Sequence, residues 1–282
     1  MADSPRVVLT IAGFDPSSGA GVTADTKTIA AHGCYGVACV TAVTVQSTAG
    51  VRRVEPLDPS LVTEMLNELA ADFEISAVHV GMLGSAAVAN AVADFVADSQ
   101  GLRFSNLILD PVLKSTSGAA LLDPKGTKVL KEKLLPIAGV LTPNADEAEI
   151  LTGLEVRNLE GMKAAASRLH EMGSAAVVIT GGHLEKTIDL LSFKSGKGIE
   201  HEVFRADRLQ SKSTHGTGCA FSTAIACHLA LGRGLAEATL LAKTYVRAAI
   251  SSALPLGRGL GPLHHLYRRE ERRRAAATGE ES

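Results

Sequence analysis

The chain has 282 residues, of which 46% are hydrophobic and 4% aromatic, enough apolar material for one large core. Its formal net charge of −2 argues against general binding to nucleic acid or to an acidic membrane surface. No apolar run reaches the roughly 20 residues of a membrane span, so small molecules are the expected partners. The four cysteines lack paired metal-ligand spacing and the first residues do not resemble a signal peptide, so we expect a cytoplasmic protein.

From residue 7 to residue 180, short β-branched runs alternate with longer patterns rich in alanine and leucine. The expected strands are residues 7–12, 37–45, 77–80, 107–110, 139–142 and 175–180. The expected helices are residues 24–32, 61–71, 86–97, 125–134, 146–151 and 161–172. Such regular alternation predicts parallel βαβ units, with helices packed on a buried sheet.

The later part of the chain departs from this alternation. Residues 188–193 and 199–204 flank a glycine-bearing turn and predict an antiparallel hairpin. Two further helices are expected at residues 220–231 and 235–254. Because no linker-like composition interrupts the pattern, we expect a single domain over residues 1–267. Residues 268–282 predict a charged, disordered tail rather than a nucleic-acid patch.

The most informative motif covers residues 213–219, with the sequence STHGTGC, directly before an expected helix. Gly216, Thr217 and Gly218 leave backbone N–H groups free at the helix start, where the helix dipole adds partial positive charge. We therefore expect an anion site. Cys219 follows at once, and a thiol at a helix start can have a lowered pKa, which suggests a thiolate beside a phosphate. The alternative interpretation of Cys219 is a small buried residue.

Other polar residues fall just after the expected strands, where open parallel sheets bind ligands. Gly13 begins a glycine-rich loop that matches neither a Walker A motif nor a dinucleotide fingerprint. Gln46 offers a donor and an acceptor to a heteroaromatic edge, and Met82 can pack on a ring face. A loop amide and an ordinary core methionine are the alternatives for these two residues.

Asp110, Asn144 and Glu147 supply the oxygen groups that hold hydrated Mg²⁺ and its phosphates. Asn144 and Glu147 also match a capping box, and both interpretations can hold together. Thr180 and Gly182, with His183 next to them, form a further close-approach site for a nucleotide. His264 and His265 lack a third ligand at suitable spacing, so we expect no metal there.

These motifs in combination resemble the ribokinase superfamily, and within it the bacterial hydroxymethylpyrimidine/phosphomethylpyrimidine kinases of thiamine biosynthesis. The resemblance covers residues 7–267. It implies a three-layer α/β/α sandwich with a mainly parallel sheet, no separate lid domain, and a homodimer. It also implies ATP and Mg²⁺ as cofactors, with 4-amino-5-hydroxymethyl-2-methylpyrimidine and its monophosphate as substrates.

The resemblance assigns roles to individual positions. Gly13, Asp25, Gln46 and Met82 would bind the pyrimidine, with Asp25 at the border of the pocket. Cys219 would be catalytic, and the amides of residues 216–218 would form the anion hole. Asn144, Thr180 and Gly182 would bind the nucleotide, while Asp110 and Glu147 would organise Mg²⁺.

One position departs from the pattern, because many of these kinases carry lysine where this chain has Thr180. Extra positive charge is useful when a second phosphate enters a site, so the departure bears on the second phosphorylation. Two alternative functions stay open. One is a pyridoxine or pyridoxal kinase of the same fold, and the other is a pyrimidine sensor without catalysis.

Overall fold

A computed structural model describes residues 4–98, 106–182, 187–270 and 273. Within these ranges, nine strands form one sheet: β1 (Val7–Phe14), β2 (Tyr35–Ser47), β3 (Gly50–Pro56), β4 (Ile75–Val80), β5 (Leu107–Leu109), β6 (Val140–Leu141), β7 (Ala176–Thr180), β8 (Ile188–Ser195) and β9 (Gly198–Arg205). The strand order is β3-β2-β1-β4-β5-β6-β7-β8-β9. Strands β2, β1, β4, β5, β6 and β7 are parallel, while β3, β8 and β9 are antiparallel to their neighbours.

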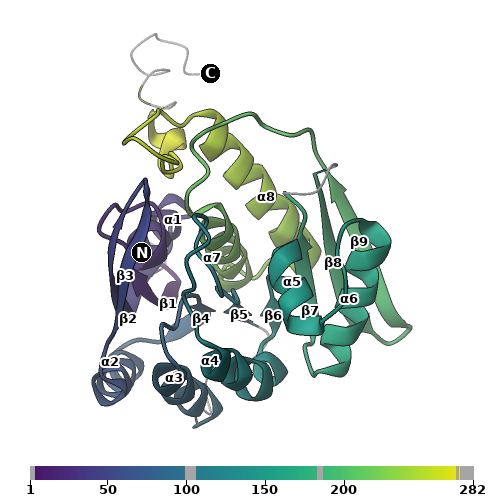
Figure 1. The fold of residues 1–282 in the computed structure, drawn as a ribbon, viewed down its shortest axis with the longest axis horizontal. Helices are drawn as coiled ribbons and strands as arrows, with labels where there is room; N and C mark the ends of the chain where they lie inside the picture. Colours follow the sequence, from purple (N-terminus) through teal and green to yellow (C-terminus); the bar gives the residue numbers. More distant parts are fainter. Residues whose placement is uncertain (1–3, 99–105, 183–186, 271–272, 274–282) are drawn as a thin grey trace.

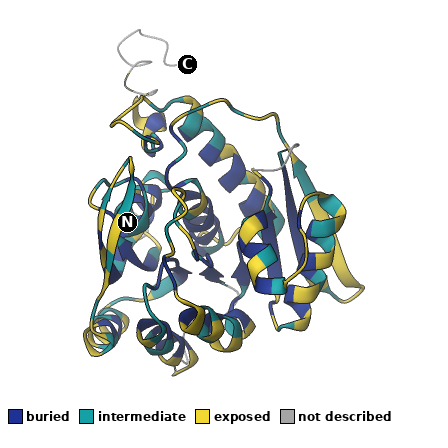
Figure 2. Ribbon diagram, viewed as in Figure 1, coloured by how far each residue is buried: buried dark blue, intermediate teal, exposed yellow. Residues whose placement is uncertain are grey.

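The helices are α1 (Gly21–Ala31), α2 (Pro59–Asp72), α3 (Ala86–Asp98), α4 (Pro124–Val129), α5 (Ala145–Thr152), α6 (Leu159–Glu171), α7 (Thr217–Ala230) and α8 (Leu235–Ser251). Helices α2 to α6 bury apolar side chains against one face of the sheet, and α1, α7 and α8 cover the other (Figure 1). The central strands are buried between these two layers (Figure 2). The predicted three-layer α/β/α sandwich is confirmed.

The order of the strands fixes where a ligand can bind. The chain runs from β1 to β2 on one side, then returns to place β4 on the other side of β1. Loops leaving β1 and β4 therefore part in opposite directions, and such a switch point opens a crevice at the carboxyl ends of the strands.

The structure differs from the predicted elements most clearly in three places. Strand β3 was not predicted, because it is an edge strand whose polar residues 52, 53 and 55 are exposed and hide its period. The predicted helix over residues 125–134 is α4 followed by a π turn (Leu130–Leu134) and a 3-10 turn (Leu135–Ile137). Helix α8 ends at Ser251, three residues before the predicted end.

Local capping explains several helix starts. Asp58 and Asp123 each accept a backbone N–H at a helix N-terminus, and each is followed by a proline at the first helical position. Asn144 and Glu147 complete the predicted capping box at the start of α5. Within the described part of the chain, no helix combines the length and apolar content needed to cross a membrane.

The tight packing of the central strands gives a test of the fold. Ile108 in β5 is fully buried, so Ile108→Ala is expected to lower the free energy of unfolding by about 2–5 kcal/mol in urea denaturation. Ile199 in β9 is 43% exposed, and the matched Ile199→Ala is expected to cost less than about 1 kcal/mol. Equal losses in the two variants would contradict the assignment of β5 to the core.

Candidate functional site

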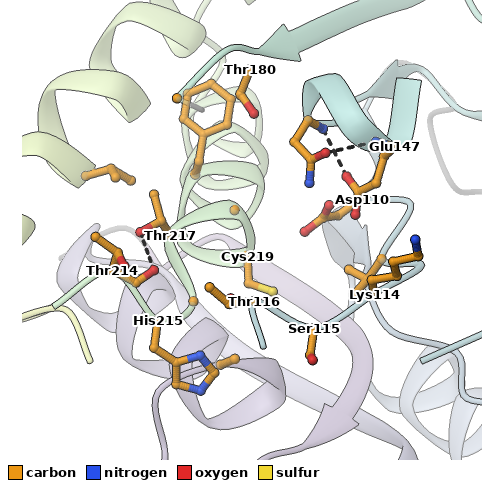
Figure 3. Close-up of a pocket in the computed structure, with 18 of the residues that line it drawn as sticks. Asp110, Lys114, Ser115, Thr116, Glu147, Thr180, Thr214, His215, Thr217 and Cys219 are labelled. Atoms are coloured by element: carbon orange, nitrogen blue, oxygen red, sulfur yellow. Dashed lines mark hydrogen bonds between the residues drawn. The ribbon is translucent and has the colours of Figure 1, made fainter. Parts of the chain in front are cut away.

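A cavity of about 1230 Å³ opens along the carboxyl ends of the parallel strands. Every predicted site residue except Asp25 lines it: Gly13, Gln46, Met82, Asp110, Asn144, Glu147, Thr180, Gly182, Gly216, Thr217, Gly218 and Cys219. In Figure 3, Asp110 and Glu147 lie on one side of Cys219, and His215 and Thr214 lie on the other. The sheet has thus gathered residues that are far apart in the sequence.

The loop before α7, where an anion site was predicted, has a tight glycine turn. Gly216 caps α7 with a φ of 78°, and a Cβ added there would lie 1.9 Å from the carbonyl oxygen of Gly19. Only glycine fits this approach. The hydroxyl of Thr217 donates to the carbonyl of Thr214 at 2.7 Å, which holds the turn (Figure 3). The N–H of Thr217 already donates to the carbonyl of Thr214 at 3.3 Å, so it is the N–H groups of Gly218, which is exposed, and Cys219 that can meet an anion in the cavity.

The thiol of Cys219 differs from the prediction of a lowered pKa. Burial raises its pKa well above the ordinary value, and the negative charges of Asp110 and Asp25 raise it further. A hydrogen bond from the backbone N–H of Gly21 opposes this shift without cancelling it. The thiol therefore stays protonated at neutral pH, and it donates to Asp110.

Two carboxyl groups face the cavity beside this thiol. Burial raises the pKa of Asp110 to about 6, with His79 opposing the shift and Asp25 adding to it. Burial, followed by the charge of Asp110, raises the pKa of Glu147 to about 8. Glu147 accepts the backbone N–H of Asn144 at 2.9 Å, and its own N–H donates to Asn144 Oδ1 at 2.9 Å.

The donor set suits one kind of metal ion. Among the described residues, no group of three or more histidine, cysteine or acidic side chains forms a closed metal site. Mg²⁺ is usually held by one or two carboxylates together with water and substrate phosphates. Asp110 and Glu147, where the charge of Asp110 raises the pKa of Glu147, fit a divalent cation that arrives with phosphates.

Asp25 is the one predicted site residue that the structure places elsewhere. It is fully buried behind the cavity wall and does not line the cavity. Its carboxylate accepts from Thr10 Oγ1 at 2.7 Å and from Thr223 Oγ1 at 2.9 Å, and it lies 3.4 Å from His79 Nδ1. The prediction failed because Asp25, the fifth residue of α1, points inward, and sequence spacing does not reveal this.

The opposite end of the cavity has the size and polarity for a ring. Met82 is buried against Gly13, where an added Cβ would lie 2.8 Å from the methionine sulfur. The side-chain amide atoms of Gln46 lie 3.1 Å from Thr44 Oγ1 and 3.1 Å from His215 Nε2. His215 Nε2 is also 2.8 Å from Asp15 Oδ2. Asp15, Thr44 and His215 were not predicted as recognition residues, although each stands within a singled-out motif or strand.

The end at β7 carries a cation that the sequence analysis missed. Thr180 and Asn144 lie side by side, with the N–H of Thr180 donating to the carbonyl of Pro143 at 3.0 Å. The next residue, Gly181, donates its N–H to Asp189 at 3.1 Å. Asp189 also forms a buried ion pair with Lys243 of α8. A charged residue on the otherwise apolar buried face of α8 was the signal for Lys243.

Further basic side chains line the same cavity from the loop after β5, from the segment before residue 213 and from α8. They are Lys114, Arg208, Lys212 and Arg247. Together with Lys243 they give the cavity the positive charge that a polyphosphate requires. His183, the last residue of the predicted glycine motif, lies outside the described residues.

Known proteins resemble the chain over nearly its whole length. A family model described as phosphomethylpyrimidine kinase matches residues 15–264. A hydroxymethylpyrimidine/phosphomethylpyrimidine kinase of Haemophilus influenzae is 40% identical over 265 residues, covering 92% of this chain and 96% of that protein. A thiamine biosynthesis bifunctional protein of Geobacter sulfurreducens is 42% identical over 266 residues, covering 94% of this chain. The chain spans only 53% of that bifunctional protein.

Among solved structures, an ADP complex of Bacillus subtilis pyridoxal kinase is similar, with a TM-score of 0.84 and 32% sequence identity. The match covers 95% of this chain and 100% of that chain. Identity is thus higher to the pyrimidine kinases named above than to this pyridoxal kinase, although all of them cover most of the present chain.

The repulsion between the two cavity carboxyl groups can be measured directly. Asp110→Asn removes the like charge, so the pKa of Glu147 is expected to fall below its value of about 8. It should remain above the ordinary value because Glu147 stays buried. A carbon-13 NMR titration of Glu147 in both proteins measures the shift. Asp146→Asn is the comparison, expected to give a smaller fall because the charge of the exposed Asp146 raises the pKa of Glu147 less than that of Asp110 does. An unchanged Glu147 titration in Asp110→Asn would contradict the coupling.

Proposed function

The chain belongs to the phosphomethylpyrimidine kinase family, and we propose that it phosphorylates 4-amino-5-hydroxymethyl-2-methylpyrimidine with ATP. We propose that it then phosphorylates the monophosphate, giving the diphosphate used for thiamine biosynthesis. The observation that carries this proposal is that one cavity joins a ring-sized end to an anion-binding helix start, with Cys219 between them.

At the ring end, each side chain has a separate task. Met82 covers one face of the ring, and Gly13 leaves room for the methionine sulfur. The amide of Gln46 pairs with the amino group and the ring nitrogen of the pyrimidine. These contacts direct the hydroxymethyl group toward the loop of residues 216–219.

At the phosphate end, the loop before α7 binds the transferred group through its backbone N–H groups. Asp110 and Glu147 would hold Mg²⁺ through water, and Asn144, Thr180 and Gly182 would border the nucleotide. Bound Mg²⁺ would supply neutralisation of the negative charge on the phosphates. Because phosphoryl transfer has a loose transition state, positioning and charge neutralisation supply most of the acceleration.

The thiol and Asp110 form a path for the substrate proton. As the hydroxyl oxygen bonds to the γ-phosphorus, the bond to the bridging oxygen breaks and ADP leaves. The hydroxyl proton passes to Cys219 Sγ while the thiol proton passes to Asp110, which already accepts it in a hydrogen bond. With a pKa of about 6, Asp110 is ionised at neutral pH and can take this proton.

The second phosphorylation needs positive charge that Thr180 does not provide. Lys243 lies in the same part of the cavity, anchored through Asp189 to the backbone of Gly181 beside Thr180. We assign Lys243 the neutralising role that a lysine at position 180 would have. The threonine is then compatible with formation of the diphosphate.

The wider properties of the protein follow from the same proposal. We propose a single kinase domain over residues 1–267, acting in the cytoplasm. We also propose a homodimer, because Val43 and Val45 are exposed two positions apart on β2, next to the edge strand β3. Exposed apolar side chains that cluster on a strand are suited to contact with a second subunit.

A second candidate function is the phosphorylation of pyridoxine or pyridoxal. The similarity to the solved pyridoxal kinase favours it, because that enzyme has the same fold. A sensor without catalysis is the remaining alternative from another class. The argument against a sensor is that binding alone does not require the anion loop, Asp110 and Cys219 together.

An assay that resolves products separates these functions. Purified protein with Mg-ATP and the hydroxymethylpyrimidine is expected to give monophosphate first and diphosphate later, resolved by chromatography over time. Monophosphate without diphosphate would remove the second step and the role assigned to Lys243. Product from pyridoxal but not from the pyrimidine would establish the second candidate, and no turnover of either would leave the sensor.

Removal of the thiol tests the proton path. Cys219→Ala is expected to keep the fold and pyrimidine binding but lower kcat by roughly 100-fold or more, the usual contribution of a positioned acid–base group. Cys39→Ala is the matched control, because Cys39 is buried in β2 away from the cavity. Calorimetric binding and steady-state kinetics of both variants provide the comparison. Near-normal turnover in Cys219→Ala would remove the thiol from the mechanism.

A further inference from the structure

The amide of Gln46 touches two partners whose own hydrogen bonds decide which way it faces. As drawn, its nitrogen Nε2 lies 3.1 Å from His215 Nε2, and its oxygen Oε1 lies 3.1 Å from Thr44 Oγ1. An amide oxygen only accepts and an amide nitrogen only donates. The chemistry of each partner therefore settles which amide atom can stand beside it.

On the first side, His215 Nε2 must carry a hydrogen. It lies 2.8 Å from Asp15 Oδ2, and this oxygen also accepts the backbone N–H groups of Gly19 at 3.2 Å and Ala20 at 3.0 Å. Burial alone raises the pKa of Asp15, but hydrogen bonds from His215 and Ser17 outweigh it and hold the pKa below the ordinary value. An ionised Asp15 requires a donor at Nε2. If the amide nitrogen of Gln46 stood beside this N–H, two donors would face each other. The amide oxygen of Gln46 can instead accept a hydrogen bond from the same N–H.

On the second side, Thr44 has one hydroxyl hydrogen and two neighbours that compete for it. Its Oγ1 lies 3.1 Å from the carbonyl oxygen of Phe14 and 3.1 Å from the amide of Gln46. The carbonyl can only accept, whereas the amide can present either an acceptor or a donor, so both contacts are satisfied only when the hydroxyl hydrogen goes to Phe14. Oγ1 is then an acceptor toward Gln46, which requires the amide nitrogen there. Both sides select the same orientation, in which the oxygen and the nitrogen of the amide exchange the places given above.

We propose that Asp15, His215 and Thr44 are positioning residues that lock the Gln46 amide with Oε1 toward His215 and Nε2 toward Thr44. The inference rests on the proposed function only for the identity of the ligand. After these protein contacts, the amide retains one lone pair and one N–H for the cavity. The pocket then reads a donor on the His215 side and an acceptor on the Thr44 side, in that order.

The order of groups on the pyrimidine agrees with this lock. Around the ring, the nitrogen at position 3 is followed by the amino group and then by the hydroxymethyl group. If the amino group faces Oε1 beside His215, the hydroxymethyl group continues past His215 toward residues 216–219. The reverse orientation of the amide would turn the hydroxymethyl group away from this loop. The fixed amide thus determines which edge of the pyrimidine binds, and it also directs the hydroxymethyl oxygen toward residues 216–219.

A structural measurement tests the orientation without any turnover. In the full-length protein, the Gln46 side-chain protons, assigned by their loss in Gln46→Met, are expected to show nuclear Overhauser effects to the Thr44 methyl group. They should show none to the His215 ring protons. Strong effects to His215 with none to Thr44 would overturn the lock.

A kinetic measurement tests the selectivity. The probe is 5-hydroxymethyl-2-methylpyrimidin-4-one, whose N3–H and C4=O present donor and acceptor in the reverse order. The wild-type protein is expected to prefer the amino substrate by at least about 100-fold in kcat/KM, because the oxo compound leaves polar groups of the site unpaired. His215→Phe removes the N–H that fixes the amide, so this preference is expected to fall by about 10-fold or more.

Two further variants make the result specific. Thr44→Val removes the other half of the lock and is expected to lower the same ratio, which keeps the test valid if His215→Phe does not fold. His264→Phe, outside the cavity lining, should leave the ratio unchanged. A general loss of activity with the ratio intact in both His215→Phe and Thr44→Val would overturn the proposal. If neither pyrimidine is turned over by the wild-type protein, the proposed function fails while the Overhauser effects still decide the orientation.

Discussion

The buried carboxylate of Asp25 is the contact on which the site depends, because it joins the four elements that carry it. From α1 it accepts hydrogen bonds from Thr10 of β1 and Thr223 of α7, and it pairs with His79 of β4. Burial lowers the proton affinity of His79, but Asp25 reverses this effect and raises the pKa of His79. A buried charge is tolerated only when it is paired and fully hydrogen-bonded, so these elements are held at one spacing.

This same charge shapes the chemistry in front of it. Asp25 raises the pKa of Asp110 and of Cys219, although burial is the larger cause for both groups. A helix start alone would favour a thiolate at Cys219, but it competes here with the negative charges of Asp110, Asp25 and Glu147. The fold therefore keeps a proton on the sulfur and a carboxylate ready to receive it. A cation-bearing ligand would find negative charge already concentrated beside the anion loop.

The sequence carried most of the fold and much of the cavity, for identifiable reasons. Parallel strands that are buried on both faces appear in the sequence as continuous apolar runs. Polar residues directly after such strands lie at the same edge of the sheet, which is why Gln46, Asp110 and Thr180 could be predicted to line one cavity. Strand β3 was missed because its exposed polar residues leave no period. The sequence also does not show how deeply a side chain is buried. Nothing in the spacing distinguishes Asp25, which lies behind the cavity wall, from Asp15, which lines the cavity.

Contacts between segments that are distant in the chain also could not be predicted from the sequence. The lowered pKa expected for Cys219 followed from its helix alone, whereas the structure adds carboxylates from three other parts of the chain. Lys243 likewise acquires a place in the site only through Asp189, 54 positions earlier. Local sequence fixes caps and periods, but the electrostatics of a site depend on contacts that only the folded chain creates.

One residue connects the two ends of the cavity in a way that neither end explains alone. His215 precedes the glycine that caps α7, and its ring reaches back to Asp15 and Gln46 at the ring end. Gly216 is fixed in turn by its close approach to Gly19, whose N–H is held by Asp15. The anion loop and the recognition amide are thus parts of one hydrogen-bonded unit. Displacement of the loop would disturb the amide, so correct placement of the ring and assembly of the phosphate site are physically linked.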